Sequence, residues 1–370
     1  MLKTIVLIMR IVALFVFALF ILRFVALAQQ PMQQPDREIT SEARTAVIEN
    51  LLKELNDAYV FAETAKKMEA DIRGRLAAKE YDSITGATAF AKKLTDDLQA
   101  VSKDKHLRVR YSHQVIPVRQ DARTPSAEEI ERERWFSRRV NFGFERVERM
   151  QGNIGYIDLR GFNDAELGTD TVAAAMTFLQ NTEAIIFDLR ENGGGSPHMV
   201  ALISSYLFDD KPVHLNDLYW RKGNKTDEFW TKPSAAKVRF PNKDVYVLTS
   251  TRTFSAGEEF TYNLKNLKRA TIVGEVTGGG AHPGGFARLA DHFGAFIPSG
   301  RAINPISKTN WEGTGVEPDV KVPKKEALQV AYLAALKKSL ANIKDAQLLA
   351  GVNELIVETQ KKLDEMRTQK

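Results

Sequence analysis

The alternation of short apolar runs with amphipathic segments, which begins near Val147, constrains the fold more than any other feature of the chain. The predicted strands cover residues 154–159, 184–189, 245–249 and 271–273, and the predicted helices between them cover residues 170–179, 199–206 and 256–267. Strands that alternate with helices favour a layered α/β architecture with a partly parallel sheet. We therefore predict an α/β domain over residues 104–325, followed by C-terminal helices over residues 326–370.

The preceding segment has the pattern of a small helical domain. Its first apolar stripe recurs with the 3.6-residue period of a helix and consists of Val47, Ile48, Leu51, Leu52, Leu55 and Tyr59. Residues 62–76 and 88–101 repeat this pattern, so we predict a three-helix domain over residues 37–103. The Gln- and Pro-rich residues 29–36 are predicted to form a linker, because they cannot bury enough apolar surface to fold.

A charged helix is predicted at residues 128–135, between the strand-like runs 107–111 and 154–159. These two runs are separated by only about 40 residues, which is too short for a further independent domain.

The first 28 residues have the layout of a secretory signal peptide. Lys3 and Arg10 precede an apolar run, and the segment ends in a small-x-small site, Ala26-Leu27-Ala28. Cleavage after Ala28 would place the mature chain in the periplasm or outside the cell, without stable membrane insertion. The alternative is an uncleaved anchor, since the stretch is long enough to span a bilayer.

Composition excludes several functions. The chain has no cysteine, which rules out disulfides, thiolate catalysis and thiolate metal sites. Its net charge of +5 includes Lys3, Arg10 and Arg23 of the N-terminal segment, and the remaining basic residues are interleaved with acidic ones. Nucleic-acid binding needs clustered positive charge, so no such partner is predicted. No histidine pair has metal-ligand spacing, so neither a metal nor another cofactor is expected.

Two loops that follow predicted strands could stabilise a negative charge. The first is Asp188-Leu189-Arg190-Glu191-Asn192-Gly193-Gly194-Gly195, whose glycines would let backbone N–H groups turn toward an anion. No Gly-Lys-Ser/Thr follows, so it is not a Walker loop, although an ordinary loop remains an alternative. The second contains Ser255, at the positive end of the helix that begins at Ala256. Its alternative is a simple N-cap serine.

A nucleophilic serine needs a base, and His106 is the best placed of six histidines because it lies where the helical domain meets the first strand. His282 lies in a Gly-rich segment that could edge a pocket. Glu312, between Trp311 and Gly313, could orient an imidazole, or could be a solvated surface carboxylate.

Four segments occur in an order that resembles the tail-specific, or C-terminal processing, serine peptidase family: residues 188–195, 254–258, 273–277 and 313–319. Residues 56–60 and 104–109 are similar to the branch of interphotoreceptor retinoid-binding protein and the tricorn core protease. The resemblance covers about residues 39–322. It implies a crotonase-like mixed-sheet α/β fold and a serine peptidase that acts on peptides or unfolded polypeptides.

Carried over by position, the resemblance assigns each candidate residue a role. Ser255 matches the nucleophile, and the N–H of Ala256 matches one oxyanion donor. Gly193 or Gly194 matches the loop that gives the other donor. His106 matches the base of the tricorn-like branch, and Glu312 matches its supporting acid.

The sequence departs from the family pattern at three places. The main branch uses a lysine about 25 residues after the serine, where this chain has Gly280. In tricorn a serine precedes the histidine, where this chain has Lys105. The interval between Tyr111 and Ile154 has no room for the usual PDZ module. A non-catalytic binder of retinoid- or fatty-acid-like ligands on the same scaffold is the alternative function, and the sequence indicates no oligomeric state.

Overall fold

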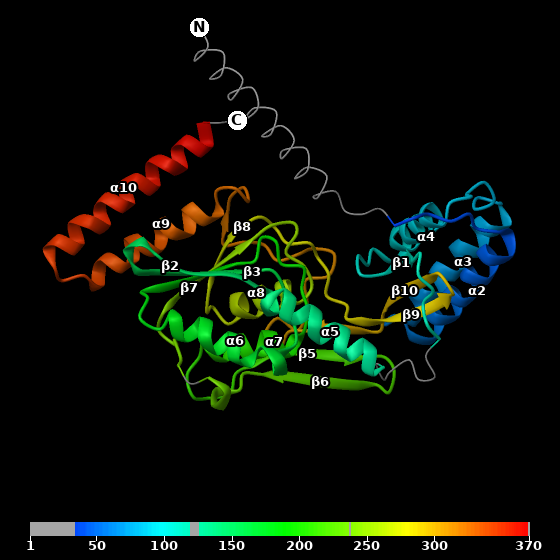
Figure 1. Ribbon diagram of the computed structural model, residues 1–370, viewed down its shortest axis with the longest axis horizontal. Coiled ribbons are helices and arrows are strands. Elements are labelled where there is room, and N and C mark those ends of the chain that lie inside the picture. Colours follow the sequence, from blue (N-terminus) through cyan, green and yellow to red (C-terminus); the bar gives the residue numbers. More distant parts are fainter. Residues whose placement is uncertain (1–33, 119–125, 237, 369–370) are drawn as a thin grey trace, which may run out of the picture.

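A computed structural model describes residues 34–118, 126–236 and 238–368 of the chain. Its centre is a six-stranded sheet with the order β12-β8-β7-β4-β3-β2 (Figure 1). The strands are β2 (Phe144–Met150), β3 (Ile154–Leu159), β4 (Ala184–Asp188), β7 (Asp244–Thr249), β8 (Thr271–Gly274) and β12 (Val320–Lys321). Every neighbouring pair is parallel except β2 and β3, which are antiparallel. The prediction of an α/β fold with a mixed sheet is thus confirmed.

Helices cover both faces of this sheet, which explains why β4 is buried along its whole length. One face packs against α6 (Ala165–Phe178), α7 (Pro197–Ser205) and α8 (Ala256–Asn266), with Phe187 and Phe260 in the shared core. The other face packs against α9 (Ala327–Ser339) and α10 (Ala346–Thr368) (Figure 1). Short 3-10 helices η1 (Asn141–Gly143), η2 (Gln151–Asn153), η3 (Pro233–Ala235) and η4 (Leu340–Asn342) join the elements.

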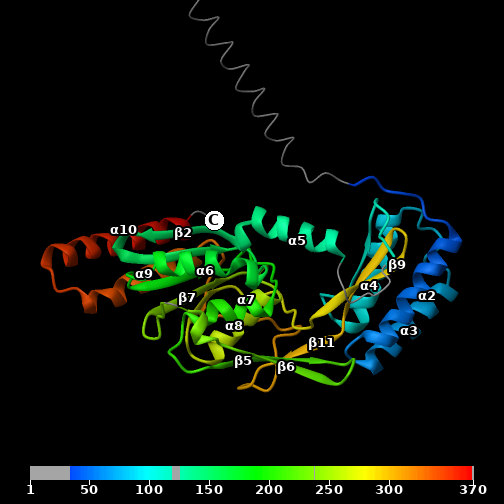
Figure 2. The same cartoon turned by 60° about the horizontal axis from the view of Figure 1, so that its bottom comes forward.

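The predicted N-terminal helices are present as α2 (Ser41–Ala58), α3 (Ala62–Ala77) and α4 (Ala87–Ser102), but they do not form a domain by themselves. Their core is completed by an antiparallel sheet of β1 (Arg108–Tyr111), β10 (Phe293–Pro298) and β9 (Gly284–Ala290). Figure 2 shows α2 and α3 on the side of β9 that faces away from the six-stranded sheet.

The helices α2 to α4 and the sheet of β1, β10 and β9 are here called the N-terminal unit. A single boundary between residues 103 and 104 does not separate this unit from the rest of the chain, because β9 and β10 come much later in the sequence. The β9–β10 hairpin leaves the α/β part of the chain and packs Phe293 and Ile297 against the N-terminal helices. The pairing of Arg108 with Phe296 joins segments far apart in sequence, so no local pattern marks it.

A third sheet, with the order β11-β5-β6, was not predicted from the sequence. It contains β5 (His214–Trp220), β6 (Lys225–Trp230) and β11 (Gly300–Ile303), and it lies beyond α7 and α8 (Figure 2). The predicted charged helix is α5 (Ala127–Arg139).

The end of the predicted linker is docked rather than free. Gln34 Nε2 donates to the carbonyl of Tyr111 at 3.0 Å, and Asp36 accepts from the backbone N–H of Thr88 at 2.9 Å. The predicted signal peptide, residues 1–28, lies outside the described residues. Among the helices that are described, none combines the length and apolar character needed to cross a membrane.

Candidate active site

Ser255 and the glycine loop meet because they follow adjacent parallel strands. β4 pairs with β7 in parallel, with Asp188 opposite Leu248, so the loops after both strands leave the same edge of the sheet. A Cβ added at Gly194 would lie 2.7 Å from the Cβ of Ser255 and 3.1 Å from the N of Ala256. The loop glycine is thus in direct contact with the start of α8.

The backbone of Ser255 has a conformation that an ordinary N-cap residue does not adopt. Ser255 occupies the N-cap position of α8, but its φ is 54° and its ψ is −120°, outside the extended region usual for caps. A positive φ is uncommon for a residue with a side chain and is often found at functional sites. The geometry favours a strained junction that presents the hydroxyl rather than a simple cap.

Glu258 holds this junction in place. Its carboxylate accepts from the backbone N–H of Ser255 at 2.9 Å. It also accepts from the hydroxyl of Thr277 and from the N–H groups of Gly279 and Gly280, at 2.5, 2.6 and 2.8 Å. Burial raises the pKa of Glu258, and these hydrogen bonds oppose that shift. The side chain therefore ties the turn before α8 to the loop over residues 277–280.

The backbone N–H groups around Ser255 differ in whether they already donate a hydrogen bond to another part of the protein. The N–H of Gly194 is donated to Asn192 Oδ1 at 2.9 Å, and that of Gly193 lies 3.3 Å from the carbonyl of Arg160. Within the described residues, the N–H groups of Gly195 and Ala256 have no acceptor. The amides of Gly193 and Gly194 are thus both engaged by protein acceptors, and the identity of the second oxyanion donor stays a prediction.

His106 lies in the same cavity as Ser255. This cavity has a volume of about 660 Å³ and is lined by both residues together with Gly193 and Gly195. The imidazole packs against the ring of Phe254, with centroids 4.5 Å apart, although no hydrogen bond joins His106 to Ser255. Burial lowers the pKa of His106 to about 4, against the opposing charge of Asp104. The imidazole is therefore neutral, and able to accept a proton, at neutral pH.

The position of His106 also explains why residue 280 is a glycine. A Cβ at Gly280 would lie 2.7 Å from Cε1 of His106 and 2.3 Å from Cζ of Phe254. The imidazole and the phenyl ring fill the space that a side chain at residue 280 would need. A lysine at this position and a histidine at 106 are thus mutually exclusive in this arrangement.

Glu312 lies behind His106, beside Asp104. Ligand atoms of the three residues, one from each, all lie within 4.8 Å of one another. His106 Nδ1 and Glu312 Oε1 are both buried without a hydrogen-bond partner, while Glu312 Oε2 accepts from the N–H of Ala281 at 2.5 Å. Burial and the neighbouring charge of Asp104 raise the pKa of Glu312 to about 7.

Asp104 and His282 are further members of this cluster; Asp104 was not predicted, and His282 was predicted only to edge a pocket. Asp104 accepts from the backbone N–H of His106 at 3.0 Å and from the hydroxyl of Tyr59 at 3.2 Å. Its carboxylate also lies 2.8 Å from His282 Nδ1, and this histidine is buried rather than at a pocket edge. The available signal for Asp104 was its place two residues before His106.

Lys105 does not take the place of the serine that precedes the histidine in tricorn. Its side chain turns away from the cluster and donates to the carbonyl of Gly278 at 2.5 Å. Asp104, rather than residue 105, is the side chain that approaches both His106 and Glu312.

The raised pKa of Glu312 makes folding stability depend on pH. The carboxyl group of Glu312 binds its proton more tightly in the folded state than in the unfolded state. This difference stabilises the folded state below pH 4.5, and the stabilisation is lost as the pH rises through about 7. Glu312→Gln cannot ionise. We expect its free energy of unfolding, relative to wild type, to rise by on the order of 2 kcal/mol between pH 5 and pH 8.

Thermal or urea unfolding at the two pH values measures this difference. Glu317→Gln, at an exposed glutamate in the same segment, is the control and should show no such change. A pH-independent effect of Glu312→Gln would mean that Glu312 is ionised throughout this range.

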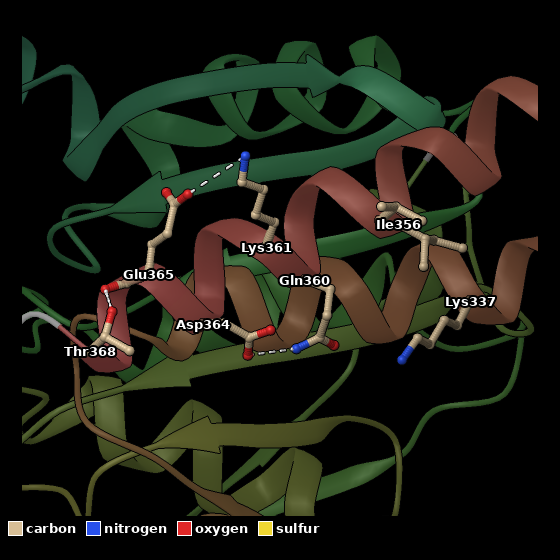
Figure 3. Close-up of a pocket in the computed structure, with 8 residues that line it drawn as sticks. Lys337, Ile356, Gln360, Lys361, Asp364, Glu365 and Thr368 are labelled. Atoms are coloured by element: carbon tan, nitrogen blue, oxygen red, sulfur yellow. Dashed lines mark hydrogen bonds and ion pairs between the residues drawn. The ribbon is translucent and has the colours of Figure 1, made fainter.

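A second hollow on the surface of α9 and α10 lacks comparable chemistry (Figure 3). Its polar side chains pair with one another, Gln360 with Asp364 at 3.0 Å and Lys361 with Glu365 at 4.0 Å. These pairs neutralise the surface, and no serine or histidine lines it. The cavity at Ser255 is thus the candidate active site.

Two family profiles match most of the chain. The profile of peptidase family S41 matches residues 153–322, and that of the N-terminal domain of S41 peptidases in eukaryotic interphotoreceptor retinoid-binding protein matches residues 39–146. The two matches together cover about three quarters of the chain. The chain belongs to peptidase family S41.

Curated relatives of this S41 chain are peptidases by name. The chloroplastic carboxyl-terminal-processing peptidase 2 of Arabidopsis thaliana is 32% identical over 174 residues, which are 46% of this chain and 32% of that protein. The tail-specific protease of Haemophilus influenzae is 31% identical over 114 residues, 30% of this chain and 15% of that protein. The aligned part thus spans about a third of the length of such relatives, or less.

Two solved structures share the fold of this S41 chain. A putative peptidase from Parabacteroides merdae aligns with a TM-score of 0.54 at 19% identity, over 76% of this chain and 90% of that one. A lipoprotein from Streptococcus agalactiae aligns with a TM-score of 0.51 at 15% identity, over 82% and 97%.

Proposed function

We propose that this chain is a serine peptidase that hydrolyses peptide bonds in peptides or unfolded polypeptides. The observation that carries the proposal is the meeting of Ser255, in its strained junction, with a buried neutral imidazole in one cavity. Two N–H groups have no acceptor within the described residues: that of Ala256, which directly follows the serine, and that of Gly195, which lines the same cavity. These are the parts that acyl transfer to a serine requires.

In the proposed mechanism, neutral His106 takes the proton from Ser255 Oγ as the oxygen attacks the carbonyl carbon of the scissile bond. The resulting oxyanion accepts hydrogen bonds from the N–H groups of Ala256 and Gly195. Gly193 is the alternative second donor, provided that its N–H leaves the carbonyl of Arg160. His106 then gives its proton to the leaving amine, and water hydrolyses the acyl-enzyme by the same steps in reverse.

Glu312 and Asp104 support the imidazole in this proposal. Protonation of His106 at Nε2 places a positive charge on the imidazole. Its other nitrogen, Nδ1, is buried without a hydrogen-bond partner, and so is Oε1 of the neighbouring Glu312. A small approach of the two groups would form the hydrogen bond that orients the ring, as catalytic hydrogen bonds tighten when substrate binds. Asp104 holds the backbone of His106.

We further propose that the protein is exported. The support is the N-terminal apolar run with the Ala26-Leu27-Ala28 site, and the proposed cleavage follows Ala28. N-terminal sequencing of the mature protein tests this, and a chain that starts at Met1 would contradict it.

The test of the proposed activity is labelling by a fluorophosphonate, which reacts with activated serines without needing the natural substrate. We expect labelling of the folded wild-type protein, together with hydrolysis of unfolded casein. A folded protein that is never labelled, but binds a fluorescent fatty acid, would instead support the non-catalytic binder. The aromatic wall of the cavity, which includes Trp220 and Phe229, is the feature that favours this alternative.

Gly194→Ala is expected to impair turnover more than folding. The added Cβ would lie 2.7 Å from the Cβ of Ser255 and close to the N–H of Ala256, and it would also have to adopt a φ of +104°. Displacing one oxyanion donor costs about 10²- to 10³-fold in rate. Steady-state hydrolysis and thermal unfolding measure the two effects. Gly285→Ala is the control, because nothing lies within 4 Å of a Cβ added there.

A further inference from the structure

One wall of the active-site cavity carries three basic side chains. Lys105, Arg108 and Arg110 all line it and belong to β1 or to the turn before it. β1 alternates exposed and buried residues, with Val109 packed in the core of the N-terminal unit, so Arg108 and Arg110 project from the same face. The cavity therefore has a pair of guanidinium groups in register along one strand.

These charges are not neutralised within the described residues. Arg108 Nε and Lys105 Nζ donate only to backbone carbonyls, and no carboxylate pairs with Arg110. The one acidic residue that lines the cavity, Asp227, is already engaged by Lys225 at 2.6 Å and by the indole of Trp220 at 2.8 Å. An uncompensated positive wall in a cleft attracts anionic ligands, and a guanidinium fork matches a carboxylate.

Apolar side chains form another part of the cavity lining: Leu218, Trp220, Phe229, Phe254 and Phe296. Phe296 lies beside Arg108, its partner in the pairing of β1 with β10. A peptide in the cavity would thus meet an aromatic surface and a row of guanidinium groups at the same time. In an extended peptide, side chains two residues apart lie on one side with a spacing of about 7 Å, which is also the spacing along β1.

We propose that this cleft selects peptides that place carboxylates on Arg108 and Arg110 and an apolar side chain against the aromatic wall. The best match is an extended segment with acidic residues at alternate positions beside an apolar residue. This inference rests on the proposed peptidase function, because it takes the ligand of the cleft to be a peptide.

Binding to the Ser255→Ala variant tests the inference without turnover. The probes are fluorescein-labelled peptides that share an apolar residue and differ at two alternate positions, with Glu, Gln or Lys, each made with a free or an amidated C-terminus. By fluorescence anisotropy, we expect the Glu peptide to bind at least about tenfold more tightly than the Gln peptide, with the preference falling as salt rises. If amidation weakens the Glu and Gln peptides alike and they bind equally, the terminal carboxylate is the group recognised and the side-chain selection is wrong; if the Glu preference persists after amidation, the side chains are recognised.

Charge reversal provides the matched comparison. Arg108→Glu/Arg110→Glu should reverse the order of the Glu and Lys peptides, whereas Lys53→Glu, at an exposed lysine of α2, should leave it unchanged. Arg108→Gln/Arg110→Gln, checked by circular dichroism, should abolish the preference if the reversed variant does not fold.

Equal affinity for the Glu, Gln and amidated peptides would overturn the proposed selection. Fluorophosphonate labelling of the wild-type protein separates the two ideas. A labelled enzyme without charge preference refutes only the selection, while an unlabelled protein refutes the peptidase.

Discussion

Ser255→Ala is expected to abolish fluorophosphonate labelling and to lower peptide hydrolysis by on the order of 10⁶-fold, since no other group can form the acyl-enzyme. Folding should be nearly unaffected. Loss of a serine at a helix N-cap costs about 1 kcal/mol in the free energy of unfolding. Alanine at residue 255 would adopt the same strained φ of 54° as serine, so the substitution adds no further backbone strain. Labelling, hydrolysis and thermal unfolding of the purified variant measure the three effects.

The control for this variant is Ser83→Ala, at an exposed serine of the N-terminal unit, which should be labelled like wild type. Undiminished labelling of Ser255→Ala would show that the probe reacts elsewhere. A variant that no longer unfolds cooperatively would mean that the hydroxyl holds the junction together, and the loss of labelling would then say nothing of nucleophilicity.

His106→Gln should lower hydrolysis by a comparable factor, because no lysine is present at residue 280 to take over as base. In wild type the rate should rise with pH through the pKa of the base, since only the neutral imidazole accepts the proton. Burial places the pKa of His106 at about 4, well below the value of 6.5 expected for an unperturbed histidine. The rise in rate that follows the deprotonation of His106 should therefore occur at acidic pH.

A pH–rate profile of wild type beside His106→Gln and Glu312→Gln separates the roles of the two groups. Because the pKa of Glu312 is raised to about 7, a mechanism that needs its carboxylate ionised gives a second limb near that pH. This limb should disappear in Glu312→Gln. Wild-type activity of His106→Gln would exclude the imidazole as the base, and an unchanged profile of Glu312→Gln would show that Asp104 alone supports it.

Local patterns were sufficient to predict most of the secondary structure and to single out Ser255 as a candidate site residue. The apolar runs that became β4 and β7, and the stripes that became α2 and α4, are set by side-chain periodicity within a short window. Ser255 was found in the same way, because a serine between a strand and a helix is a local feature.

Local sequence patterns could not predict the β9–β10 hairpin, nor which backbone N–H groups around Ser255 are free to donate. β9 and β10 lie in a Gly-rich segment, and their place in the N-terminal core follows from pairing with β1, far away in the chain. The sequence suggested Gly193 or Gly194 as the loop donor, but the side chain of Asn192 occupies the amide of Gly194. Which amide stays free depends on peptide orientations that sequence spacing does not encode.

The sequence by itself thus determined the layered α/β architecture, the candidate nucleophile Ser255 and the glycine, rather than a lysine, at residue 280. It did so because each rests on residue identity and short-range periodicity. Only the tertiary structure decided that His106 fills the space beside Gly280, that Asp104 and His282 join Glu312 behind it, and that Arg108 and Arg110 face the cavity. These relations arise where the N-terminal unit packs against the main sheet, and burial at that contact, rather than residue type, sets the pKa values of His106 and Glu312.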